Sequence, residues 1–155
     1  MAGTRRVGRQ GLDRFGEYGA MPDDSVPTEL GYTSEDVEVA LVRVRASCTA
    51  LPEVTEKLSH GSPTFFVRKS FVMFHDDHHG DGRLAIWCPA PEGAQALMVD
   101  SEPDRFFVPP YVGHRGWIGL RLDVDVDWDE VDAVIVDAYR CVAPKKLVAL
   151  LDADP

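Results

Sequence analysis

Two runs of β-forming residues lie almost end to end in this chain, and they limit the folds that it can adopt. The runs are "TFFVR" at 64–68 and "FVMFH" at 71–75, and only Lys69 and Ser70 separate them. Strands joined by so short a connection run antiparallel, because a parallel pair needs a crossover of a dozen or more residues. The sequence therefore predicts a β-hairpin and an antiparallel sheet around it.

The remaining elements are predicted from the spacing of apolar residues. Alternation in "RLAIWC" (83–88) predicts a third strand, and "RFFV" (105–108) and "WIGLRL" (117–122) predict two more. Helices are expected from the cap in "TSED" near Thr33 to Pro52, at 91–99, at 127–142 and in "KKLVALL" near the end. The order α-β-β-β-α-β-β-α-α predicts an α+β fold in two layers, with helices on one face of a five-stranded antiparallel sheet.

The chain divides into two unequal parts. Residues 1–32 hold Gly, Pro and polar residues without a sustained apolar period, which predicts a disordered segment. Arg5, Arg6, Arg9 and Arg14 make its beginning basic, so an arm that touches phosphate is the alternative. Residues 33–155 have the length of a single domain.

The bulk composition indicates a cytoplasmic protein. No apolar run approaches the roughly 20 residues that span a membrane, so no membrane partner is expected. The three cysteines are far apart, as expected of reduced thiols in the cytoplasm. The formal net charge is −10, whereas nucleic-acid binders usually show a basic footprint. Any contact with DNA must therefore come from a local group of cations.

The stretch "HDDHHGDG" (75–82) is the first candidate site, because six of its eight residues can ligate a metal. A zinc site needs three or four converging ligands, and neighbouring residues at a loop tip diverge. "GDG" is typical of turns. We therefore expect a polar loop between two strands, with no metal and no cofactor. His60 in "SHGSP" and His114 in "VPPYVGHRGW" belong to no recognisable catalytic set, so no enzymatic activity is expected.

Three longer motifs carry a resemblance to a known family. "LSHGSPTF", "DRFFVPPYVGHRGWIGLRLD" and "AYRCVAPKKLVALL" closely resemble the MmcQ/YjbR-like family in order and spacing, over about residues 35–151. The resemblance implies a two-layer α/β domain like that of secretion chaperones, without an established activity or cofactor. It also implies DNA binding through a double wing of hairpins, which would fall on the Arg68–Lys69 turn and the loops 75–82 and 109–116.

The DNA hypothesis predicts which cations contact phosphate. They are Arg68, Lys69, Arg83, Arg115, Lys145 and Lys146. The alternative partner is a protein, including a second copy of the chain, which the acidic charge favours.

The alternation within the strands predicts a second surface. Residues at every second position face the helices, so the positions between them face away. The candidates for this open face are Phe66, Trp87, Trp117 and Arg121. A surface of aromatic rings and arginines can stack bases or hold a planar anion, or it can be buried in a dimer or under the last helix.

Overall fold

The computed structural model describes residues 30–153, so most of the predicted disordered segment lies outside the described residues. The elements are α1 (Ser34–Thr49), β1 (Thr55–Ser59), β2 (Ser62–Val67), β3 (Lys69–Asp76), β4 (Leu84–Cys88), α2 (Ala94–Ser101), β5 (Phe106–Phe107), β6 (Ile118–Arg121), α3 (Trp128–Val142) and α4 (Lys145–Ala153). Two short 3-10 turns, η2 (His78–Gly80) and η3 (Gly113–Arg115), lie in connections. No described helix is long and apolar enough to cross a membrane.

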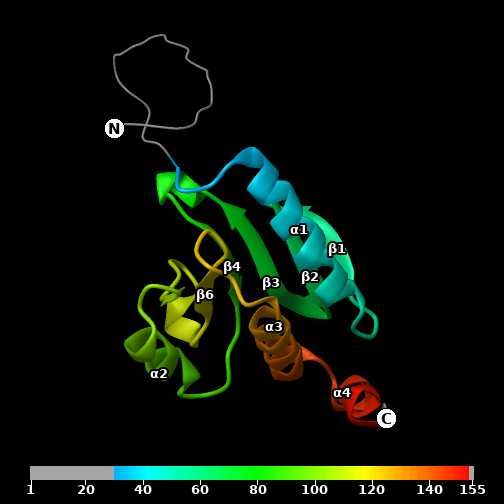
Figure 1. The fold of residues 1–155 in the computed structure, drawn as a ribbon. Coiled ribbons are helices and arrows are strands. Elements are labelled where there is room, and N and C mark those ends of the chain that lie inside the picture. Colours follow the sequence, from blue (N-terminus) through cyan, green and yellow to red (C-terminus); the bar gives the residue numbers. More distant parts are fainter. Residues whose placement is uncertain (1–29, 154–155) are drawn as a thin grey trace, which may run out of the picture.

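The predicted α+β class is confirmed. Every paired strand is antiparallel, and the sheet has the order β1-β2-β3-β4-β6-β5. Helices α1 and α3 lie side by side against one face, and both contact β3 (Figure 1). The main core fills the space between this face and the helices, and Phe65, Ile86 and Ile135 are among its fully buried side chains.

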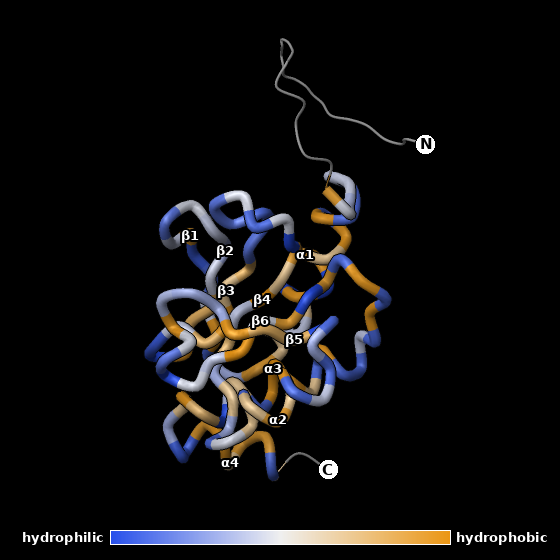
Figure 2. The backbone as a smooth tube through the Cα atoms, turned by 90° about the vertical axis from the view of Figure 1, so that its left-hand side faces the viewer, coloured by the Kyte–Doolittle hydropathy of each residue, from blue (hydrophilic) through white to orange (hydrophobic). Residues whose placement is uncertain are grey.

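The sheet has six strands, so the prediction of five was wrong by one. The missed strand, β1, has the sequence "TEKLS", lies at an edge, and is largely exposed. Polar edge strands lack the apolar alternation on which the prediction relied, and the tube in Figure 2 is mostly hydrophilic there. His60 and Gly61 form the turn to β2 with φ values of 51° and 82°, as in tight hairpins with two left-handed residues. "SHGSP" is therefore the turn of a hairpin.

The start of the folded part lies slightly earlier than the predicted residue 33. The cap in "TSED" is confirmed, because the Asp36 amide donates to the Thr33 hydroxyl and the Thr33 amide donates to the Asp36 carboxylate. Leu30 packs against the core, however, and Tyr32 is buried, with its hydroxyl donating to the Asp76 carboxylate over 2.7 Å. These two residues anchor the chain before α1 begins.

A second apolar cluster lies on the face of the sheet away from the helices. It consists of Ala85, Trp87, Phe107, Val112 and Trp117. Val112 belongs to the segment between β5 and β6, so this segment covers the far face of β4 and β6. The strand β4 is consequently buried along its whole length on both faces.

Gly119 shows how closely the second cluster is packed. It pairs directly with Phe107 across β5 and β6, and a Cβ built on Gly119 would collide with the Phe107 ring. The aromatic ring thus fills the space that a side chain at position 119 would need. Glycine at this position is a requirement of packing.

We expect Gly119→Ala to lower the free energy of unfolding by about 1–3 kcal/mol, because it over-packs a buried contact. The matched control is Gly31→Ala, where the added Cβ meets no atom within 4 Å, and where a change within about 0.5 kcal/mol is expected. Urea denaturation of both variants measures the difference. Equal stabilities of the two variants would contradict the close packing of Phe107 against Gly119.

Candidate functional site

Two arginines from different connections lie over the second cluster. The Arg83 guanidinium lies 3.9 Å from the centroid of the Phe107 ring, and the Arg115 guanidinium lies 5.2 Å from that of Trp117. Phe107 and Trp117 both belong to the cluster on the face away from the helices. Two of the six predicted phosphate contacts therefore share one face. Contact with an aromatic ring holds each guanidinium at the surface. The Arg83 guanidinium also pairs with the Asp81 carboxylate over 3.9 Å, whereas no ion pair within the described residues engages Arg115.

The other predicted cations lie elsewhere. Arg68 forms the turn between β2 and β3 with φ of 68°, and its guanidinium donates to the exposed Glu53 over 3.0 Å. Lys69 follows it and is exposed. The turn lies near Tyr139 in the C-terminal half of α3. The Tyr139 hydroxyl donates to the backbone carbonyl of Pro52 over 2.8 Å. Lys145 and Lys146 are exposed at the start of α4, just beyond that end of α3.

The expectation of an open aromatic face is wrong at both tryptophans. Trp87 and Trp117 point away from the helices as the alternation predicted, but they are only 2% and 3% exposed. They pack in the second cluster with Val112, and the rings of His75 and His78 also contact Trp87. Arg121 pairs with Asp123 over 2.7 Å. Phe66 is half-buried on the uncovered part of the sheet, with the Lys57 ammonium 4.7 Å from its ring centroid. The accessible part of this face therefore lies on β1 and β2.

The carboxylates of "HDDHHGDG" hold the connection between β3 and β4 together. Asp76 accepts from Tyr32, the Asp77 carboxylate accepts from the Gly82 amide over 2.7 Å, and the Asp81 carboxylate accepts from the Arg83 amide over 3.0 Å. Among the described residues, no group of three or more His, Cys, Asp or Glu side chains is placed to hold a metal. The acids of this loop thus have a structural explanation.

Two histidines of the same loop, the buried His75 and the half-buried His78, pack against Trp87. The His75 ring centroid lies 4.0 Å from that of Trp87 and 4.4 Å from that of His78. The His75 Nδ1 lies 3.0 Å from the Ser62 hydroxyl, whereas the Nε2 atoms of His75 and His78 and the Trp87 Nε1 have no hydrogen-bond partner among the described residues. Burial, followed by the imidazoles of His78 and His79, lowers the pKa of His75 from 6.5 to about 4. His75 is therefore neutral at pH 7.

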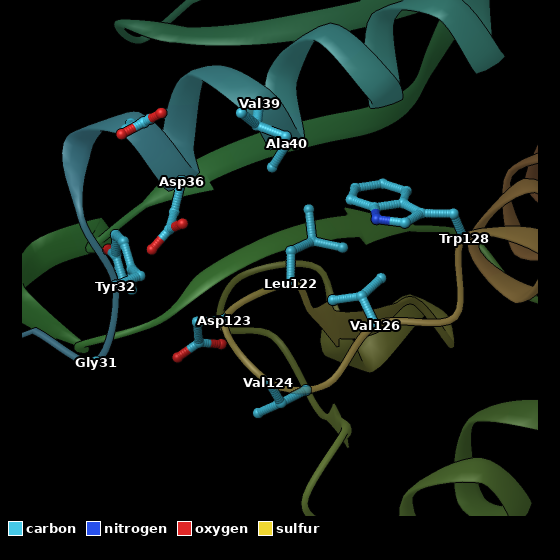
Figure 3. A pocket seen from close by; sticks show the side chains of 11 residues that line it. Gly31, Tyr32, Asp36, Val39, Ala40, Leu122, Asp123, Val124, Val126 and Trp128 are labelled. Atoms are coloured by element: carbon cyan, nitrogen blue, oxygen red, sulfur yellow. The ribbon is translucent and has the colours of Figure 1, made fainter.

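A groove of about 380 Å³ lies on the helix side, between α1 and the chain that leads from β6 to α3. At one end the carboxylates of Asp36 and Asp123 lie beside Tyr32, and the other end is apolar (Figure 3). The apolar lining consists of Val39, Ala40, Leu122, Val124, Val126 and Trp128. The groove can hold an apolar group that carries a cation at one end.

This groove was not expected from the sequence, although a pattern marks one of its walls. In "LDVDVDWD" (122–129), apolar residues alternate with aspartates. Leu122, Val124, Val126 and Trp128 line the groove, whereas Asp125 and Asp127 are exposed. The stretch lies between a strand and a helix, so the alternation was not interpreted as a surface.

The chain is similar to one protein family and to a solved structure with the same fold. A family model described as YjbR matches residues 49–141. The crystal structure of Deinococcus radiodurans protein DR2400, described as a DUF419 domain, superposes with a TM-score of 0.57 at 16% sequence identity. The match covers 72% of this chain and 87% of that one, and it concerns the fold alone. No curated protein matches the chain.

We expect the stability of the protein to fall between pH 6.5 and pH 4 in a way that depends on His75. In this range the unfolded chain binds a proton at His75, whereas the folded chain does not, because burial lowers the pKa to about 4. Urea denaturation at several pH values should show that the free energy of unfolding depends less steeply on pH in His75→Gln than in the wild type. His114→Gln removes an exposed histidine and serves as the control. Identical pH dependence in all three proteins would contradict the burial of a neutral His75.

Proposed function

The chain belongs to the YjbR family, and from this membership we propose that it is a non-catalytic protein that binds DNA through phosphate contacts made by its hairpin connections. The observation that supports the proposal is the placement of Arg83 and Arg115. Arg83 directly follows the second expected wing (75–82), Arg115 belongs to the third (109–116), and both lie over aromatic rings of the second cluster on one face. The Arg68–Lys69 turn at the other end of the sheet supplies further cations.

The distribution of charge is compatible with this proposal despite the net charge of −10. Glu35 and Asp36 line the groove on the helix side, whereas Arg115 and Arg83, which pairs with Asp81 over 3.9 Å, lie on the opposite face. Exposed charges further apart than about 8 Å are largely screened at physiological salt. A local pair of arginines can therefore attract phosphate, but only weakly and with strong dependence on salt.

A protein-interaction module is the second candidate function. The observation that favours it is the groove, whose apolar lining and acidic end are suited to a peptide and unsuited to a polyanion. The two functions use opposite faces of the domain. They can be tested separately.

We expect duplex DNA to bind with a dissociation constant on the order of micromolar or weaker at low salt, and to bind less as salt rises. Fluorescence anisotropy at about 50 mM and about 200 mM salt gives the salt slope. Arg83→Gln combined with Arg115→Gln should weaken binding and reduce the slope by about 2, since each phosphate contact contributes about one. Charge reversal at Arg68 and Lys69 should weaken binding to all sequences alike.

The matched control is Arg45→Gln, which removes one arginine from the helix side. Arg45 lies on α1 and pairs with Glu56 over 2.6 Å. Its loss should leave both the affinity and the salt slope unchanged. The absence of binding at the lower salt, or binding that ignores salt, would overturn the DNA proposal and favour the protein-interaction module.

A further inference from the structure

The groove on the helix side has the chemistry of a binding site for a basic peptide. Val39 is 55% exposed although it lines the groove, and Val124, Val126 and Trp128 are only half-buried. These side chains present apolar surface to solvent along one strip. A partner that covers them gains the free energy of removing that surface from water.

Acidic side chains at the groove favour a partner with positive charge. Glu35 lies in the groove wall and Asp125 lies in the opposite chain segment, and both are exposed. Within the described residues, no hydrogen bond or ion pair engages either carboxylate. The groove therefore repels anions, and a peptide that carries both apolar and cationic side chains complements it.

Trp128 already accepts a guanidinium. The Arg43 guanidinium lies 4.8 Å from the centroid of its ring, next to the apolar end of the groove. A second guanidinium from a bound peptide would lie near the exposed Asp36 carboxylate at the other end, since both oxygens of Asp123 already accept from Arg121. The groove thus fits an arginine that is adjacent in sequence to an apolar residue.

The chain itself contains such a sequence. Residues 5–15, "RRVGRQGLDRF", hold four arginines, and two of these precede an apolar residue directly, in Arg6–Val7 and Arg14–Phe15. We define residues 5–15 as the basic arm. No other stretch of this length in the chain has as many arginines.

The basic arm is joined to the groove by the chain itself, and this link favours its binding there. The described chain starts at Leu30, and the next residues, Gly31 and Tyr32, are part of the groove wall. Residues 16–29 join the basic arm to this point and reach at most roughly 50 Å when extended. Because a tethered segment has an effective concentration in the millimolar range, weak contacts suffice for it to bind.

From the chemistry of the groove and of residues 5–15, we propose that the basic arm docks into the groove between α1 and residues 122–128 of the same molecule. Its arginines pair with the exposed acids at Glu35 and Asp36, and its apolar side chains cover Val126 and Trp128. This docking is independent of the DNA proposal, because it uses the opposite face of the sheet.

Paramagnetic relaxation in the full chain tests the proposal. A nitroxide is attached to Gln10→Cys in a Cys141→Ser background, since Cys141 is exposed and the other two cysteines are buried. We expect the amide signals of Val124 and Val126 and the indole signal of Trp128 to lose intensity. The amides of His114 and Arg115, on the opposite face, should keep theirs.

Two substitutions on α1 provide the matched comparison. Glu35→Lys reverses a charge in the groove wall and should restore the groove signals, whereas Glu38→Lys makes the same change at an exposed position outside the lining and should not. Unchanged signals elsewhere in the spectrum establish that both variants fold. Groove signals that keep their intensity in the unsubstituted protein would overturn the proposal.

A mixing experiment distinguishes an arm that docks in its own molecule from an arm that docks in a second copy. A mixture of isotope-labelled protein without nitroxide and unlabelled protein with nitroxide reports contacts between molecules. Equal loss of the groove signals in this mixture would place the arm of a second copy in the groove and overturn docking within one molecule. Intensity loss confined to a different surface would also overturn the proposal.

Discussion

The burial of β4 on both faces is the constraint on which the rest of the structure depends. Its residues alternate between the main core under α1 and α3 and the second cluster on the far face. A strand with two apolar faces needs cover on both sides, and the segment between β5 and β6 supplies the second cover through Val112. This cover brings Arg115 beside Trp117 and places Phe107 beneath Arg83. The position of the cations is therefore a consequence of packing.

Much of the fold was predictable because its signals are local. The β2–β3 hairpin, the cap at Thr33 and the apolar stripe of α3 all arise from residues close together in sequence. The hairpin turns at Arg68, one residue before the expected connection of Lys69 and Ser70. The direction of the side chains in β4 and β6 was also predicted correctly from alternation. Alternation shows which way a side chain points, but it carries no information on what covers it. Trp87 and Trp117 were consequently expected on an open surface and are buried.

The candidate site was less predictable than the fold, because it depends on contacts between distant residues. The sequence identified Arg83 and Arg115 as cations but did not show that they share a face, which follows from the pairing of β4 with β6. The acids of the 75–82 loop suggested ligands, yet their partners include Tyr32, which lies 44 residues away from Asp76. The groove was missed for a similar reason, since one wall comes from α1 and the other from residues 122–128.

The separation of charges between the two faces connects the two proposals. Glu35 and Asp36 lie on the helix side, while Arg83 and Arg115 lie beyond the sheet and its second apolar cluster. A domain with a net charge of −10 can present a cationic surface only where its acids are held elsewhere. A basic arm bound in the groove would neutralise acids on the helix side and would keep its own arginines from phosphate. The salt dependence of DNA binding would then report mainly on Arg83, Arg115 and the β2–β3 turn, because cations paired with protein carboxylates release no counterions from DNA.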